Sequence, residues 1–424
     1  DTQTAGYGKQ KTDGFVNSVV INNSDNVTIG GTAAADRNIL GYCTESCIVA
    51  SGSTGDPSNN LRILGNFIGV GADAVANLFT AAKGTGIVLS EGATNAFIGG
   101  TATGAGNTIK SNTFGAVRAE DVSGLTIQAN RIMFNASAPQ TCSGCTARAS
   151  GIFLGGVTDS VVGSTNAAGK NVMAGEYSKE LTIGNSTITD DPSTNIQVVG
   201  NNLGVMDDNT TAYPTPENQI TVTDDSDYIR IEKNIIANAH SNTNPTYLDG
   251  IGILGNAQHV SISQNSIHDN DHRGISIGGG GPVVNDSTDN DTGPNGKLNY
   301  PTYFRVTESG GNTKVDYSYQ GAAGNYRIEF FSNTVADTDG PGEGEHYLGS
   351  VDIVYAGNGQ SILNHTLTGI NHDNITMTAT EIDEDSPNGF GATSEFGAAG
   401  TPPSDLAVSK RLLNPEAMVT GQVV

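Results

Sequence analysis

The sequence predicts an all-β chain, with a right-handed parallel β-helix followed by a small antiparallel β-sandwich. Three observations carry this prediction. A motif recurs at a nearly fixed spacing, Val and Ile recur at strand-like intervals, and Gly and Asn gather between these strands as turn residues. Glycine fills 56 of the 424 positions and charged residues make up only 15%, which fits many short strands joined by tight turns.

The repeat is clearest at Asn26-Val-Thr-Ile-Gly-Gly-Thr32, which returns as Asn95-Ala-Phe-Ile-Gly-Gly-Thr101 and, degraded, as Ser160-Val-Val-Gly-Ser-Thr165. The final threonines lie 69 and then 64 positions apart. A second element, Gly65-Asn-Phe-Ile-Gly69, recurs as Gly200-Asn-Asn-Leu-Gly204. A period of this length indicates a solenoid in which each period contains several coils.

The period divides into three coils of about 21 to 23 residues, each built of short strands that turn at Asn and Gly. From Asp13 to Tyr300 this predicts about 13 coils and a length of roughly 60 Å at ~4.8 Å per coil. Ile, Val and Leu should point inward, and Asn at successive turns should form side-chain ladders. A β-propeller is the alternative, but its antiparallel hairpins require a turn spacing that the sequence lacks.

The motifs I-G-G-T, G-A-G-N-T-I (Gly104 to Ile109), G-N-F-I-G and D-G-I-G-I resemble those of bacterial right-handed parallel β-helix repeat proteins. The resemblance covers about residues 12–300 and implies a large secreted or surface-attached protein. It extends to the segment 285–301, which is similar to the motif that closes such helices. We therefore expect the β-helix to span residues 1–300 and to lie in an extracellular or cell-surface protein.

Beyond the helix, the segments Tyr326 to Phe331, Tyr347 to Ser350 and Ile375 to Thr380 alternate as antiparallel strands do. They resemble an immunoglobulin-like β-sandwich module that follows the helix in this family, here over residues 302–397. Residues 398–424 then form a linker and a terminal strand. The part that begins at Asp405-Leu-Ala-Val-Ser-Lys410 resembles the start of an immunoglobulin-type surface-protein repeat, and is expected either to lack a partner or to be donated to a neighbouring subunit.

The net charge of −24, from 20 basic and 44 acidic residues, argues against nucleic acid as a partner, because phosphate binding needs clustered Lys and Arg. No run of about 18 apolar residues exists, so membrane insertion is not expected. The partners that we predict are further copies of the chain in a polymer, other surface proteins, and polysaccharide.

The four cysteines form two close pairs, Cys43 with Cys47 and Cys142 with Cys145. Two local disulfides in an oxidising compartment are the expected interpretation. A shared zinc site is the alternative, but about a hundred residues separate the pairs, which is several coils in a solenoid.

A loop at the end of the helix predicts a metal site. Asp286, Asp289, Asp291 and Asn295 alternate with Ser, Thr and Gly, and place several oxygen ligands in one short segment, as Ca²⁺ requires. The alternative is a loop of Asx-turns whose side chains bond their own backbone. A second acidic group, Asp337, Asp339, Glu343 and Glu345, is predicted to be a solvated loop.

The candidates for catalysis are Asp249, Asp269, Asp271 and His272. Asp249-Gly-Ile251 resembles the D-G-I part of the polygalacturonase motif, Asp269-Asn-Asp-His272 its double aspartate, and the segment 272–277 its G-H-G-I-S-I. That resemblance implies paired carboxylates for glycoside hydrolysis. The aspartates are not adjacent, however, and the Gly before His is missing. An ordinary turn with exposed polar residues is the alternative.

The predicted function is therefore a structural or adhesive β-helix protein of the extracellular space or cell surface, with a subunit of an extracellular filament as one form of it. A polysaccharide-active enzyme, such as a pectinase-like hydrolase or lyase, is the alternative.

Overall fold

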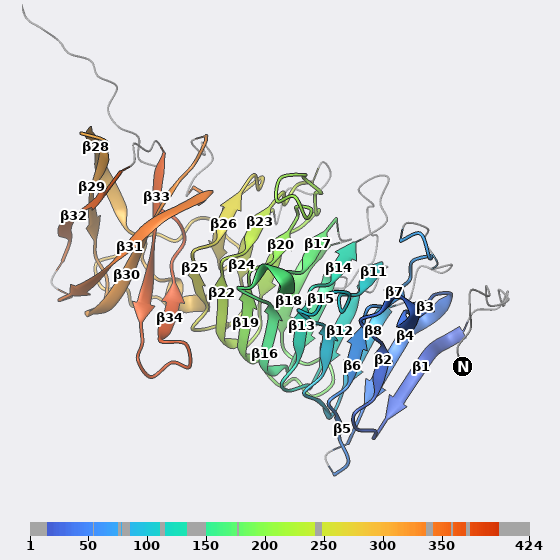
Figure 1. Cartoon of the computed structure of the whole chain (residues 1–424). Helices are drawn as coiled ribbons and strands as arrows, with labels where there is room; N and C mark the ends of the chain where they lie inside the picture. Colours follow the sequence, from blue (N-terminus) through green and yellow to red (C-terminus); the bar gives the residue numbers. More distant parts are fainter. Residues whose placement is uncertain are drawn as a thin grey trace, which may run out of the picture.

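The computed structural model describes residues 15–397 except 54, 75–77, 79–84, 111–114, 134–149, 176–177, 242–247, 336–341, 358 and 370–373. Within these ranges the chain is almost entirely β-structure, in two parts (Figure 1). The first is a parallel β-solenoid with three sheets. The second is an antiparallel module at its C-terminal end. The predicted fold class is confirmed.

Each coil of the solenoid contributes one strand to each of three parallel sheets. Sheet A contains β1 (Phe15–Asn22), β4 (Cys43–Ser51), β8 (Thr85–Ser90), β12 (Val117–Glu120), β15 (Ser150–Gly155), β18 (Lys179–Gly184), β21 (Ile220–Val222), β24 (Ile251–Ile253) and β27 (Ile275–Ile277). Sheet B contains β2 (Thr28–Gly30), β6 (Arg62–Leu64), β10 (Phe97–Gly99), β13 (Thr126–Gln128), β16 (Thr158–Gly163), β19 (Thr194–Val199), β22 (Asp227–Glu232) and β25 (Ser261–Ser263).

Sheet C contains β3 (Ile39–Leu40), β7 (Phe67–Ile68), β11 (Thr108–Lys110), β14 (Arg131–Met133), β17 (Val172–Ala174), β20 (Asn202–Leu203), β23 (Ile235–Ala237) and β26 (Ser266–His268). Two short strands, β5 (Ser58–Asn59) and β9 (Ala93–Thr94), pair with each other, and each precedes a strand of sheet B in the chain. Single turns of 3₁₀-helix lie at η1 (Ala34–Asp36), η2 (Ala167–Gly169) and η3 (Pro294–Lys297).

The prediction of three coils per period is wrong, because each period contains two. Ile29 pairs with Ile63, and Ile63 pairs with Ile98, so the interval from the first I-G-G-T motif to the second spans two coils. The coils are also longer and less regular than predicted. A short coil leads from Ile251 to its register partner Ile275, and a much longer one leads from Ile48 to Ile87. Loops of unequal length between the short strands account for the difference, and for fewer coils than predicted.

The first glycine of the I-G-G-T motif is required by the close approach of the neighbouring coil. Gly30 and Gly99 both adopt positive φ angles, +83° and +77°. A Cβ on Gly30 would lie 2.1 Å from the carbonyl oxygen of Leu64, and one on Gly99 would lie 1.9 Å from that of Gln128. Only glycine allows the coils to stack this closely, which explains why the I-G-G-T motif recurs.

The predicted asparagine ladder is present at the corner between sheets B and C. Each side-chain amide donates to the carbonyl oxygen of the next amide, at 2.9 to 3.1 Å, and most also donate to a strand carbonyl of the preceding coil. All members except Asn38 are buried. Neutral amides thereby satisfy one another inside the molecule without burying charge. The ladder consists of Asn38, Asn66, Asn107, Asn130, Asn171, Asn201, Asn234 and Asn265.

The C-terminal module has two antiparallel sheets, ordered β28-β29-β32 and β31-β30-β33-β34. Its core contains Tyr317 and Tyr319 from one sheet and Ile328, Phe330 and Met377 from the other. Its strands are β28 (Thr302–Ser309), β29 (Asn312–Tyr319), β30 (Gly324–Ser332), β31 (His346–Tyr355), β32 (Ser361–Leu367), β33 (Ile375–Ile382) and β34 (Phe390–Thr393). The described part of the chain contains no helix long and apolar enough to cross a membrane.

Candidate functional site

The predicted metal loop and the predicted catalytic group both lie in the region where the last coil of the solenoid meets the C-terminal module. We call this region the junction. The final strands of the solenoid, β25, β26 and β27, have no further coil to pair with, so their outer backbone groups need other partners. The module supplies them. The junction is therefore where the chain combines buried charge, backbone hydrogen bonds and a cavity.

Side-chain carboxylates of the module accept hydrogen bonds from the last coil. Glu395, which is fully buried, accepts from the backbone N–H of Ile277 at 2.8 Å and of Val283 at 2.9 Å. Glu329 accepts from the hydroxyl of Ser263 at 2.6 Å and the N–H of Gln264 at 2.9 Å. Burial raises the pKa of both glutamates, and the hydrogen bonds that they accept oppose this.

Three further residues of the module, Thr393, Gly344 and Glu343, also form hydrogen bonds with the last coil. Thr393 accepts from the N–H of Ile262 through its hydroxyl, at 2.8 Å, and Gly344 exchanges two backbone hydrogen bonds with Ile267 at 2.8 and 3.0 Å. Glu343, expected in a solvated loop, accepts from the backbone and side-chain nitrogens of Asn270. Asp337 and Asp339 of the same predicted loop lie outside the described residues. All three exposed strand edges of the last coil are thus covered by the module.

Asp249 is part of this junction. Only 2% of its surface is exposed, and its carboxylate accepts from the backbone N–H of Arg273 at 3.2 Å. The Arg273 guanidinium lies 3.6 Å from Asp249 and 2.9 Å from Glu395, between two buried acids. Burial raises the pKa of Asp249, and the charge of Arg273 opposes the shift. Asp249 thus holds the last coil to the module through Arg273.

The other three catalytic candidates are held in separate local contacts. Asp269, with 74% of its side chain exposed, contacts the neighbouring His268 at 2.8 Å. Asp271 contacts His240 of the preceding coil at 2.7 Å. The backbone N–H of His272 donates to Leu248 at 3.2 Å. The three aspartates therefore have three different partners, and the contacts of the described residues do not link them into one group. His272 does act on Asp249, because its charge opposes the rise in the pKa of that carboxyl group.

The loop predicted to bind a metal ion contains an Asx-turn, which was the alternative interpretation of its sequence. Asp286 accepts from the backbone N–H groups of Thr288 at 2.7 Å and of Asp289 at 2.5 Å, and these bonds lower the pKa of Asp286. Asn295 is buried, and its side chain accepts from the N–H of Val260 and donates to the carbonyl of the same residue, both at 2.9 Å. Asn295 therefore closes the corner before β25.

Asp289 and Asp291 line a cavity of about 230 Å³ between the solenoid and the module. Glu381 and His259 line it as well. Burial raises the pKa of Asp289 to about 7, with smaller contributions from the charges of Asp286, Glu381 and Asp291. In the part of the chain that the structure describes, no three His, Cys, Asp or Glu side chains form a group able to hold a metal ion.

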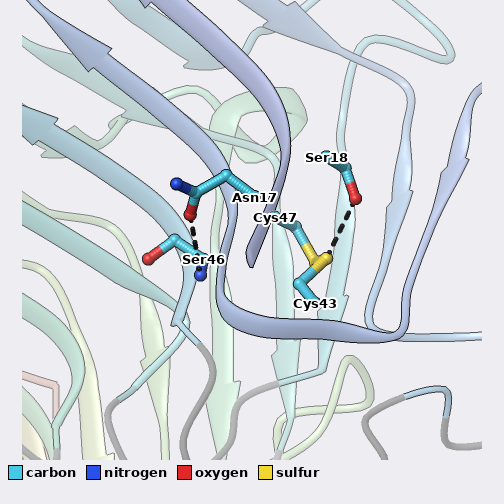
Figure 2. Close-up of a disulfide and its surroundings, with 5 residues drawn as sticks. All are labelled: Asn17, Ser18, Cys43, Ser46 and Cys47. Carbon is cyan, nitrogen blue, oxygen red and sulfur yellow. Dashed lines mark hydrogen bonds between the residues drawn. A yellow bond between two sulfur atoms is a disulfide. The ribbon is translucent and has the colours of Figure 1, made fainter. Parts of the chain in front are cut away.

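One of the two predicted disulfides is confirmed. Cys43 and Cys47 are bonded to each other at the start of β4, with their Cα atoms 5.2 Å apart (Figure 2). The Ser18 hydroxyl of the adjacent β1 lies 3.1 Å from the sulfur of Cys43. Cys142 and Cys145 lie outside the described residues.

Sequence patterns did not identify the carboxylates that hold the junction. Glu329 and Arg327 occupy alternate positions between the apolar residues of the segment Tyr326 to Phe331, and this pattern indicates that the side chain of Glu329 faces solvent. It faces the last coil instead. Its partners are 65 and 66 residues away in the sequence, and those of Glu395 more than a hundred, so no local spacing could indicate them.

No protein-family model matches the sequence, and no curated protein matches it. Among solved structures, the chain is similar to the enzymatically active domain of tailspike protein 2 of bacteriophage CBA120. The two share 12% sequence identity with a TM-score of 0.31, over 90% of this chain and 72% of that one. A likeness of this size carries no argument about activity.

Proposed function

We propose that the chain is a rigid structural or adhesive module of the extracellular space or cell surface, belonging to the β-helix repeat proteins that its motifs resemble. The asparagine ladder supports this proposal, because it runs without a break from Asn38 to Asn265 and fixes each coil against the next. Cover of the last coil by the module, proposed here to be of immunoglobulin type, adds to this rigidity. A spacer or filament subunit needs these properties.

Electron microscopy of native material tests the proposal. Single particles should be straight rods of constant length, and antibody labelling should place them outside the cell. Rods joined end to end would support the filament form, whereas strictly separate rods at high concentration would exclude it. Bent or variable particles, or labelling inside cells, would contradict the spacer function.

We further propose that Ca²⁺ binds at the junction by drawing together Asp286, Asp289 and Asp291, whose side chains do not form a metal-holding group in this structure. Asp289, Asp291 and Glu381 line one cavity, and Asp286 lies close enough for its charge to raise the pKa of Asp289, so a divalent cation would offset the repulsion among these carboxylates. Isothermal calorimetry with Ca²⁺ should show binding, and the double variant Asp289→Ala, Asp291→Ala should remove it. No heat of binding, together with a melting curve unchanged by chelator, would exclude the site.

A polysaccharide-active enzyme is the second candidate, and the cavity favours it. Asp289, whose pKa burial raises to about 7, lines this cavity together with Asp291 and Glu381, and a carboxyl group of raised pKa near a second carboxyl group is the arrangement that glycoside hydrolysis uses. Release of reducing sugar from a broad polysaccharide panel would support this function if Asp289→Asn abolished it. Release that instead depended on Asp269 or Asp271 would move the site to the predicted catalytic group, and inactivity on every substrate would leave the structural proposal alone.

A further inference from the structure

The arginines of this acidic chain divide into two groups. Six of the eight that the structure describes have a carboxylate within ion-pair distance. Arg37 and Arg62 have no such partner among the described residues, although the chain has 44 acidic residues and a net charge of −24. The paired arginines are Arg118, Arg131, Arg230, Arg273, Arg305 and Arg327.

Arg37 lies before β3 in the first coil, and its side chain is exposed. Its guanidinium carbon lies 4.1 Å from the ring centroid of Phe67, which belongs to β7 in the second coil. The Nε–H donates to the carbonyl oxygen of Gly65 at 3.0 Å. One nitrogen is thus fixed to the backbone and one face to a ring, which leaves the two terminal nitrogens as free donors.

Arg62 also lies over an aromatic ring, one coil further along. It is exposed on β6, and its guanidinium carbon lies 4.8 Å from the ring centroid of Phe97, its register partner on β10. Only the corner at Gly65 and Asn66 separates β6 from β7, so both arginines lie beside the same corner of the solenoid. Two planar groups of donors are therefore held in place by aromatic rings on neighbouring coils.

We propose that Arg37 and Arg62 bind the carboxylate or sulfate groups of an acidic polysaccharide strand that lies along these first coils. This inference rests on the adhesive form of the proposed function and names its ligand. A guanidinium edge matches the planar pair of oxygens of a carboxylate, and the supporting ring lowers the cost of ordering the side chain. Ile39 on β3, 47% exposed, offers apolar surface next to Phe67 for the face of a sugar ring.

Charge favours a polysaccharide strand over a second copy of the chain. Contact between two copies would bring together two molecules that each carry a net charge of −24. A single polymer strand brings only the charges along its contact. Because exposed charges more than about 8 Å apart are largely screened at physiological ionic strength, the acidic remainder of the protein does not prevent this local contact.

Isothermal calorimetry of the full chain with polygalacturonate, dextran sulfate and neutral dextran tests the proposal. The protein should bind at least one of the two acidic polymers and not the neutral one, and the affinity should fall as salt is raised. Arg37→Gln with Arg62→Gln should weaken binding at least about tenfold, since each lost charge-assisted bond contributes more than a neutral one. Arg131→Gln, which removes a partly exposed arginine already paired with Asp207, should change binding less than about twofold.

A second variant tests the role of the rings. Phe67→Leu with Phe97→Leu keeps both charges and the apolar surface but removes the support, and should weaken binding about threefold. Circular dichroism and electron microscopy should show unchanged rods in both double variants, so that loss of binding is separable from loss of the spacer structure. Unaltered binding by the arginine variant, equal binding of dextran, or no binding of either acidic polymer would overturn the proposal. A third result would also overturn it: the unmodified protein binds no acidic polymer, and the arginine variant no longer self-associates. The arginines would then form contacts between copies of the chain.

Discussion

The interior coils and the junction both supply hydrogen-bond partners to the backbone of a neighbouring coil, but the interior uses neutral groups and the junction uses carboxylates. Inside the solenoid, backbone groups pair with the next coil and neutral Asn amides complete the corners. At the junction no further coil exists, and the carboxylates of Glu329 and Glu395 take its place. Buried amides that satisfy one another cost little, whereas buried carboxylates lose hydration and need cations or several donors. The comparison teaches that the junction should respond most to mutation and to pH.

The largest effect should follow from removing the carboxylate of Glu395. Glu395→Leu would leave the N–H groups of Ile277 and Val283 without these acceptors. The largely buried side chain of Arg273 would keep Asp249, at 3.6 Å, as its one carboxylate partner among the described residues. We expect the free energy of unfolding to fall by about 4 kcal/mol, as for other broken buried ion pairs. Urea unfolding measures it, and hydrogen exchange should show faster opening of β27. Glu395→Gln, which keeps an acceptor, should cost less than half as much. Equal losses would mean that shape rather than hydrogen bonding holds the junction.

A smaller loss is expected in the middle of the ladder. Asn171→Ala would remove four hydrogen bonds, two accepted from Asn130 and two donated, to Ile127 and Asn201. Since no charge is left buried, the expected loss is about 3 kcal/mol by urea unfolding. Gln197→Ala, on the outer face of β19, serves as the control and should change stability by less than about 0.5 kcal/mol. A loss below about 1 kcal/mol at Asn171 would show that the ladder specifies register without stabilising the coils.

Stability should depend on pH through Asp289. Its pKa of about 7 is raised above the ordinary value of 3.8, so the folded state binds this proton more tightly than the unfolded state. The stability that Asp289 contributes is therefore fully present at low pH and is lost as pH rises through 7. With allowance for partial exposure, thermal unfolding between pH 5 and 9 should show a decrease of about 2 kcal/mol.

Asp289→Asn provides the control for this pH dependence. The variant should keep the low-pH stability and lose most of the slope between pH 5 and 9. Ca²⁺, if it binds as proposed, should flatten the slope in the unmodified protein by offsetting the charge of the ionised carboxylates. If stability depended on pH as steeply in Asp289→Asn as in the unmodified protein, the effect would belong to other buried acids. Burial also raises the pKa values of Asp249, Glu329 and Glu395.

The features that the sequence revealed are those that repeat. The I-G-G-T glycines and the asparagine ladder recur along the solenoid because every coil meets an equivalent neighbour, and periodicity makes this visible. The number of coils per period was not visible, since loops of unequal length separate the strands. The junction occurs once, so it has no period. Its contacts join residues such as Ile262 and Thr393, 131 positions apart, and only the folded chain brings them together.

The smallest effect should come from the Cys43–Cys47 disulfide near the other end of the solenoid. The bond joins residues only four positions apart, and so it removes little entropy from the unfolded chain. Reductant would also act on Cys142 and Cys145, so the double variant Cys43→Ala, Cys47→Ala gives the cleaner measurement. We expect the free energy of unfolding to fall by about 1.5 kcal/mol, near the lower end of what disulfides contribute.

Hydrogen exchange would show which strands lose stability in the double cysteine variant. Exchange should become faster only in β1 and β4, because the two strands pair along their length and Ser18 contacts Cys43. The junction amides of β27 should keep their exchange rates, since neither cysteine touches the module's contacts with the last coil. A loss as large as that of Glu395→Leu, or exchange that spreads to β27, would show that the solenoid unfolds as one unit and that its two ends are not separable in stability.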